Sequence, residues 1–279
     1  MSQKKPIIAI LYDFDSTLSR TDMQNFSFIP SLGLTPAEFW GMTTKFSEET
    51  GCERTLSYLF MMQKLTKERG IKMTREWLRE QGAKIEFFPG VETWFKRIND
   101  YGKEHNVIVE HYLVSSGNKE IVEGCSIAKE FKRLYACEFM FDENGEPIWP
   151  KIAINYTQKT QYFFRISKGV YDESDDAGVN NKRPDRRIPY SNMVYIGDGM
   201  TDIPTMILVK ENGGRSIAVY PIGKEDKVQN LYDDGRVNFV CPANYNERTS
   251  LESVMKLIIR SVEINNSLKI RENKNPFQD

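Results

Sequence analysis

Five short apolar segments, rich in β-branched and aromatic residues, recur along the chain between polar or amphipathic stretches. Their nearly continuous apolar character predicts strands that are buried on both faces. These segments are Ile7–Tyr12, Val107–Val114, Met193–Ile196, Ser216–Tyr220 and Val237–Val240. The stretches with helical spacing are Val91–Tyr101, Asn118–Leu134, Thr157–Ser167 and Thr201–Lys210. This alternation predicts an α/β fold, with a parallel sheet covered by helices on both faces.

The segment from residue 19 to residue 88 interrupts the alternation, because it contains helical patterns and no convincing strand. Thr35–Glu38 has the pattern of a capping box, with proline at the first helical position. A further helix is predicted from Arg54 to Arg69. We therefore expect residues 1–18 and 89–279 to form the α/β core, and residues 19–88 to form a helical cap domain inserted after the first strand.

Two smaller features complete the predicted organisation. The turn residues Asp142–Gly145 lie between apolar flanks, and they predict a β-hairpin over Phe139–Ile148. Residues 169–189 are polar and rich in Asp, Asn, Arg and Pro, which predicts a long loop. The run Tyr58–Met62 could line a substrate pocket in the cap, although helical apolar runs mostly pack in cores.

Composition and charge narrow the class of protein. Hydrophobic residues make up 40% of the 279 residues and charged residues 28%, which is typical of a folded globular protein. The formal net charge is −1, so the chain has no general positive field for nucleic acid or an anionic membrane. The four cysteines lack metal-ligand spacing, and no apolar stretch is long enough to span a bilayer. We expect a cytoplasmic protein that binds neither nucleic acid nor membrane; the oligomeric state is left open.

Candidate chemistry lies where two predicted strands end. Asp13 and Asp15 follow the first strand, and side chains two residues apart on an extended strand point the same way. An isolated pair of this kind is more often a turn or helix cap. A second acidic pair, Asp198 and Asp202, follows another buried strand. Because ligands bind at the carboxyl ends of parallel strands, and because clustered carboxylates repel, the two pairs predict a shared Mg²⁺ site.

These motifs resemble those of the haloacid dehalogenase superfamily, whose phosphatases carry D-x-D-x-T at the first strand and G-D-x-x-x-D at the fourth. The resemblance implies that Asp13 is the nucleophile and a magnesium ligand. It implies that Asp15 is the general acid and base, and that its backbone carbonyl also touches the metal. Asp198 would complete the metal shell, and Thr17 would position Asp15 or its loop. Asp202 would hold a metal-bound water or the site lysine.

The family also uses a hydroxyl at the end of the second strand and a lysine. Ser116 is the preferred hydroxyl because it directly precedes Gly117, and Ser115 is the alternative. The resemblance implies that the Ser116 hydroxyl and the following backbone N–H groups bind phosphate. Two lysines occur on one predicted helix. Lys159 lies near its start, where a cation opposes the helix dipole and invites a functional explanation, whereas Lys168 lies in the last turn, where a cation is favourable.

The order of the motifs is the family order from the first strand to about Val240, and the helical insertion lies where the phosphoserine-phosphatase-like branch places its cap. The resemblance therefore implies Mg²⁺-dependent hydrolysis of a small phosphate monoester through a covalent aspartyl-phosphate. A phosphomutase of the same superfamily is one alternative. A receiver domain is another, but its acidic pair and phospho-acceptor usually come from different strands. The 169–189 loop is outside the general pattern, which leaves the substrate open.

Overall fold

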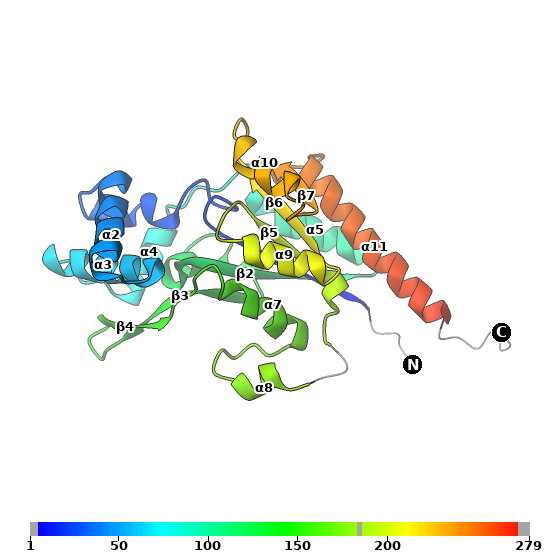
Figure 1. Ribbon diagram of the computed structural model, residues 1–279, viewed down its shortest axis with the longest axis horizontal. Coiled ribbons are helices and arrows are strands. Elements are labelled where there is room, and N and C mark those ends of the chain that lie inside the picture. The colour runs from blue at the N-terminus through cyan, green and yellow to red at the C-terminus, as the bar shows by residue number, and fades with distance from the viewer. Residues whose placement is uncertain (1–4, 183–185, 273–279) are drawn as a thin grey trace.

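A seven-stranded sheet forms the centre of the computed structural model, which describes residues 5–182 and 186–272 (Figure 1). The strand order is β4-β3-β2-β1-β5-β6-β7, and each neighbouring pair is parallel except β3 and β4. The strands are β1 Ile7–Tyr12, β2 Ile108–Asn118, β3 Arg133–Phe141, β4 Pro147–Ile152, β5 Met193–Gly197, β6 Arg215–Tyr220 and β7 Phe239–Pro242. The predicted α/β fold is confirmed. Because the strand order reverses between β1 and β5, the loops after these two strands diverge and leave a crevice between them.

Helices cover both faces of the sheet. The helix α5 packs against α11 on one face, and α7 packs against α9 on the other (Figure 1). The core helices are α5 Val91–Glu104, α6 Lys119–Glu123, α7 Lys159–Lys168, α8 Asp176–Asn180, α9 Ile203–Glu211, α10 Asp226–Asp233 and α11 Ser250–Glu272, with short 3-10 helices η2 Ala128–Glu130 and η3 Tyr190–Asn192.

The segment between β1 and α5 is helical, as predicted, and gathers at one end of the molecule (Figure 1). Its helices are η1 Met23–Asn25, α1 Phe28–Ser31, α2 Pro36–Thr50, α3 Arg54–Glu68 and α4 Arg75–Gly82. The capping box of α2 forms as its sequence predicts: the Glu38 amide donates to the Thr35 hydroxyl, and the Thr35 amide donates to the Glu38 carboxylate at 2.7 Å.

Backbone contacts fix the helical cap at its base and along α4. The entering and leaving chains meet in an antiparallel bridge between Ser19 and Phe87. The helix α4 also crosses α6 of the core at very short range: a Cβ on Gly82 would lie 1.9 Å from the Ile121 carbonyl oxygen, and one on Gly124 would lie 1.8 Å from that of Arg79. Glycine is therefore required at both positions for the helices to approach this closely. The exact domain boundaries at 18/19 and 88/89 stay a prediction.

The predicted helix from Asn118 to Leu134 is wrong in its second half. The helix α6 ends at Glu123, because Gly124 follows it and packs against the backbone of α4 at Arg79. Turns and η2 then lead to β3, which begins at Arg133 and pairs in parallel with β2 and antiparallel with β4. The predicted hairpin over 139–148 is confirmed as the β3–β4 pair, and its β4 carbonyl at Pro147 accepts a hydrogen bond from Gln63 of α3.

The predicted long loop after α7 contains the short helix α8, and its residues 183–185 lie outside the described part of the chain. Its first half is fixed by the buried guanidinium of Arg165, which donates to the carbonyl oxygens of Asp172 at 2.7 Å and Glu173 at 3.0 Å. Arg187, in its second half, pairs with Glu110 of β2 at 2.7 Å. The insertion is therefore tied to the core at both of its described ends.

A series of hydrogen bonds between buried polar side chains links α5 to β1 and β2. The indole N–H of Trp94 donates to the Tyr12 hydroxyl at 2.9 Å, and Tyr12 lies 2.9 Å from Nδ1 of His111. Nε2 of His111 lies 3.1 Å from the side-chain oxygen of Asn99. These partners suit a neutral imidazole that accepts at Nδ1 and donates at Nε2. Burial lowers the pKa of His111 to about 3.

This buried histidine predicts a loss of stability in mild acid. Above pH 6.5 His111 is neutral in both states and contributes no pH dependence. Below it, the unfolded chain binds a proton that the folded chain excludes, so the free energy of unfolding should fall by about 2 kcal/mol between pH 7 and pH 5. Urea unfolding at both pH values measures this difference. His111→Gln should reduce it by that amount, and an equal pH dependence in the wild-type protein and the variant would contradict the assignment.

Candidate active site

A cavity of about 420 Å³ opens where the loops after β1, β2 and β5 face the cap. The core contributes most of the charged lining, and α2 and α3 contribute aromatic, hydroxyl and cationic groups. The lining residues are Asp13, Asp15, Ser16, Asp22, Gln24, Trp40, Thr43, Thr44, Arg54, Thr55, Tyr58, Ser116, Gly117, Lys159, Asp198, Gly199, Met200 and Thr201. Six of the eight residues predicted for the site belong to this lining, and they come from separate parts of the sequence. Of the other two, Asp202 contacts Lys159 directly and Thr17 is outside the lining.

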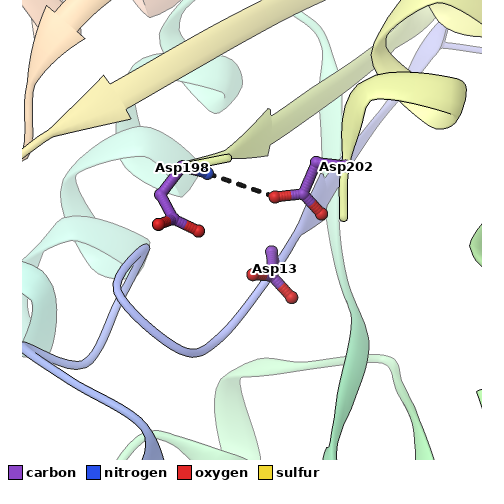
Figure 2. Close-up of side chains that lie close together, drawn as sticks. All are labelled: Asp13, Asp198 and Asp202. Atoms are coloured by element: carbon purple, nitrogen blue, oxygen red, sulfur yellow. Dashed lines mark hydrogen bonds between the residues drawn. The ribbon is translucent and has the colours of Figure 1, made fainter. Parts of the chain in front are cut away.

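Three carboxylates converge on one point of the cavity floor. Asp13 follows β1, Asp198 follows β5, and Asp202 directly precedes α9. Figure 2 shows the three side chains facing a common space, and one oxygen of each lies within 4.8 Å of the others. The amide of Asp13 donates to the carbonyl oxygen of Ile196 at 2.9 Å, which continues the β1–β5 pairing to the site. The predicted convergence of two acidic strand ends is therefore present.

Lys159 is the cation of this cluster. Its ammonium group lies 2.6 Å from Asp13 and 2.7 Å from Asp202, and its side chain is 1% exposed. Burial alone would lower the pKa of Lys159, but the adjacent carboxylates raise it above its ordinary value and keep the group charged. Lys168, the alternative, is directed away from the cavity and donates to the carbonyl oxygens of Val179 and Asn181 in the 169–189 loop.

Asp202 holds the lysine and the turn before α9. One carboxylate oxygen accepts from Lys159 and from the Tyr195 hydroxyl at 2.7 Å, and the other accepts from the amide of Asp198 at 3.2 Å. A Cβ on Gly197 would lie 2.4 Å from the Asp202 carboxylate, so the glycine of the motif makes room for this contact. Tyr195 was not predicted. It lies inside an apolar strand, and no local pattern marks its hydroxyl as part of the site.

The donor set fits a small hard cation. Burial, together with the negative charge of Asp202, raises the pKa of Asp13 to about 7 and that of Asp198 to about 8. Burial is the larger cause of both shifts, and the neighbouring carboxylates add to it against the opposing charge of Lys159. Carboxylate oxygens are the ligands that Mg²⁺ prefers. Asp13 and Asp198 are the better placed ligands, since both oxygens of Asp202 already accept hydrogen bonds.

Asp15 lies on the cap side of the cluster. Its carboxylate accepts a hydrogen bond from the amide of Met23 at 2.7 Å. Burial, followed by the nearby charges of Asp22 and Asp13, raises the pKa of Asp15 well above its ordinary value. This carboxyl group is therefore suited to carry a proton at neutral pH. Asp22 was not predicted, because an isolated aspartate in a polar stretch carries no distinguishing pattern.

Thr17 does not contact Asp15 through its hydroxyl. That hydroxyl is buried and has no hydrogen-bond partner among the residues that the structure describes. The turn is held by its backbone instead, because the Tyr245 hydroxyl donates to the Thr17 carbonyl oxygen at 2.9 Å. Ser16 has a φ of 57°, so the chain turns sharply directly after Asp15.

The last residues of β2, where its pairing with β3 is irregular, separate the roles of the two serines. The Ser115 hydroxyl is fully buried and accepts from the Gly117 amide at 2.9 Å. Ser116 lines the cavity, and its hydroxyl has no partner within residues 5–182 and 186–272. The next amide, that of Asn118, lies 3.2 Å from the sulfur of Met23. Both amides after Ser116 are thus engaged here, and the Ser116 hydroxyl is the group left for a ligand.

Gly117 allows the end of β2 to approach the first strand. A Cβ at this position would lie 2.0 Å from the methyl carbon of Met23 and 3.0 Å from the Asp15 carboxylate. Of the apolar run Tyr58–Met62, Tyr58 lines the cavity, whereas Leu59 and Met62 are buried in the core. The preference for core packing is therefore correct for most of the run; Tyr58 is both buried and part of the cavity lining, and Phe60 is exposed.

Comparisons with known proteins agree with this geometry. No family model matches the chain. An uncharacterized protein of Borreliella burgdorferi is 28% identical over an alignment of 290 positions, gaps included. The alignment covers 94% of this chain and all of that protein. Among solved structures, a HAD family hydrolase from Salmonella enterica serovar Typhi matches 92% of this chain and 72% of its own, with a TM-score of 0.56 and 16% identity. A probable phosphoserine phosphatase from Vibrio cholerae matches 94% of this chain and 67% of its own, with a TM-score of 0.61 and 11% identity.

The chain has the haloacid dehalogenase (HAD) fold. The resemblance and the fold class predicted from the sequence, including the helical cap after the first strand, are confirmed at this level. Within residues 5–182 and 186–272, no helix is both long enough and apolar enough to cross a membrane.

Metal binding at this site should depend on pH. Protons and a divalent cation compete for Asp13 and Asp198, whose pKa values are about 7 and 8 in the metal-free protein. Mg²⁺ should therefore bind more tightly at pH 8.5 than at pH 6, with about a tenfold change in apparent affinity per pH unit for each proton displaced. Isothermal titration calorimetry measures this. Asp198→Asn should remove most of the binding, and an affinity independent of pH would contradict the assignment.

Proposed function

We propose that the protein is a Mg²⁺-dependent phosphatase that hydrolyses a small phosphate monoester through an aspartyl-phosphate on Asp13. The observation that carries this proposal is the buried contact of 2.6 Å between Asp13 and Lys159, with Asp198 and Asp202 converging on the same point of an open cavity. The HAD fold supports it, because hydrolases and a probable phosphatase share that fold.

In the first half of the reaction, a carboxylate oxygen of Asp13 attacks phosphorus and the ester oxygen leaves. Asp15 gives its proton to that leaving oxygen, which the raised pKa of Asp15 makes possible at neutral pH. The Ser116 hydroxyl and the Lys159 ammonium group hold the phosphate oxygens. A bound Mg²⁺, held by Asp13 and Asp198, would neutralise phosphate charge and reduce its repulsion from the attacking carboxylate.

In the second half, the Asp15 carboxylate takes a proton from water as the water oxygen attacks phosphorus. The bond between phosphorus and Asp13 breaks, phosphate leaves, and Asp15 is again protonated. Asp202 and Tyr195 touch neither substrate nor water in this scheme. They hold Lys159 in place, which keeps the ammonium group directed at the Asp13 carboxylate.

The cap lining favours a small-molecule substrate. Trp40, Arg54 and Tyr58 form the cap side of a cavity of about 420 Å³. Such a volume is typical of a metabolite site. Phosphoserine, other phosphorylated amines and nucleoside monophosphates are the candidates, and phosphoserine is the first to test because the similar Vibrio cholerae protein is a probable phosphoserine phosphatase.

Loss of the nucleophile is the direct test. With Mg²⁺ present, the wild-type protein should release phosphate from an aryl phosphate and from at least one member of a panel of phosphorylated metabolites, and chelation should stop the release. Asp13→Asn keeps the shape of the side chain but cannot form the ester, so turnover should fall more than about a thousandfold. Circular dichroism should confirm that the variant is folded. Wild-type rates in this variant would refute the assignment of Asp13.

Product analysis distinguishes hydrolysis from phosphoryl transfer. If water is the acceptor, free phosphate and free alcohol should form in equal amounts, and added alcohols should not become phosphorylated. A phosphomutase would instead yield an isomeric phosphate ester and little free phosphate. Phosphorus NMR of the reaction mixture resolves these products, and a dominant isomer would replace the proposed hydrolysis by transfer.

A further inference from the structure

Tyr58 belongs to the cap, yet its hydroxyl is bonded to the core. The tyrosine lies on α3, is 7% exposed and lines the cavity. Its hydroxyl donates to the carbonyl oxygen of Ser116 at 2.7 Å, which joins the cap directly to the end of β2. Burial raises the pKa of Tyr58 well above its ordinary value, so the hydroxyl remains a donor at any pH near neutral.

The acceptor of this bond belongs to the residue with the unpartnered hydroxyl. The Ser116 carbonyl oxygen accepts from Tyr58 of the cap and lies 3.3 Å from the thiol of Cys137 on β3. A thiol is a weak donor, so the tyrosine makes the stronger of the two bonds. Two elements therefore fix the orientation of the peptide unit of Ser116, from which its side-chain hydroxyl projects.

The contact between Tyr58 and Ser116 depends on where α3 lies relative to the core. The helix α4 is pressed against α6 through Gly82 and Gly124 and cannot shift without losing that close crossing. Trp40 of α2 packs edge-on against Tyr58, with ring centroids 6.1 Å apart, and donates to Asn25 within the cap. The position of the Tyr58 hydroxyl thus follows the position of α2 and α3 relative to the core.

We infer that Tyr58 is a positioning residue, which orients the Ser116 hydroxyl toward phosphate only when α3 is seated against the core. The inference rests on the proposed function, since it assumes that Ser116 binds the phosphate group. On this inference, the hydrogen bond from Tyr58 to Ser116 links the affinity for phosphate to the position of the cap on the core. A tyrosine that only fills space in the cap would not have this effect.

Tyr58→Phe tests the inference because it removes the hydroxyl and keeps the ring. With inorganic phosphate as the probe, its inhibition constant should rise roughly tenfold, the value of one hydrogen bond. KM should rise by a similar factor and kcat should change less, because the bond acts on binding of the phosphate group in both the ground state and the transition state. In a Ser116→Ala background the same substitution should have little further effect, since the hydroxyl that it orients is gone.

Tyr112→Phe is the matched control. Tyr112 is also a buried tyrosine, on the same strand as Ser116, and its hydroxyl donates to Glu110 at 2.6 Å. Its loss should lower the melting temperature and leave KM and the phosphate inhibition constant unchanged. If Tyr58→Phe also lowers only the melting temperature, Tyr58 is a packing residue and the inference fails while the proposed function stands. If the wild-type protein neither releases nor binds phosphate, both fail.

Discussion

The buried contact between Lys159 and the carboxylates of Asp13 and Asp202 is the constraint on which the site depends. A lysine and two aspartates removed from water are costly unless they face one another, and the low dielectric makes their mutual geometry strict. Loops after two parallel strands and the first residue of α7 must therefore meet at one point. The sheet order provides this meeting, because β1 and β5 are neighbours at the point where the order reverses. The excess negative charge that remains is what makes a divalent cation the natural ligand.

Much of this arrangement was predictable because its signals are local. Apolar runs identified five of the seven strands, and the capping box identified α2. The two acidic motifs led to Asp13 and Asp198, and the argument from the helix dipole preferred Lys159, which the structure brings to Asp13. Each motif occupies a short window of sequence, the shared site followed from two such windows taken together, and the need for a lysine came from the resemblance.

What the sequence did not reveal depends on contacts between distant segments. The predicted helix over 118–134 stops at Glu123, because Gly124 packs against the backbone of α4 at Arg79. Tyr195 and Tyr58 resemble core aromatics, and only their hydroxyl partners, Asp202 and the Ser116 carbonyl, give them a place in the site. Hydrogen bonds of this kind join residues up to 58 positions apart, and no periodic pattern records them.

The close crossing of α4 and α6 at Gly82 and Gly124 distinguishes α4 from the other two long helices of the inserted segment, α2 and α3. Because α4 touches the core backbone without intervening side chains, it behaves as an extension of the core, while α2 and α3 reach the core mainly through side chains. An exchange of caps between related proteins would therefore preserve the scaffold best if the graft ended before Arg75 and left Gly82 with its partner Gly124. The same restriction applies to sequence change: apart from the Tyr58 contact with Ser116, α2 and α3 can vary in their lining residues, whereas α4 is constrained by its contact with the core.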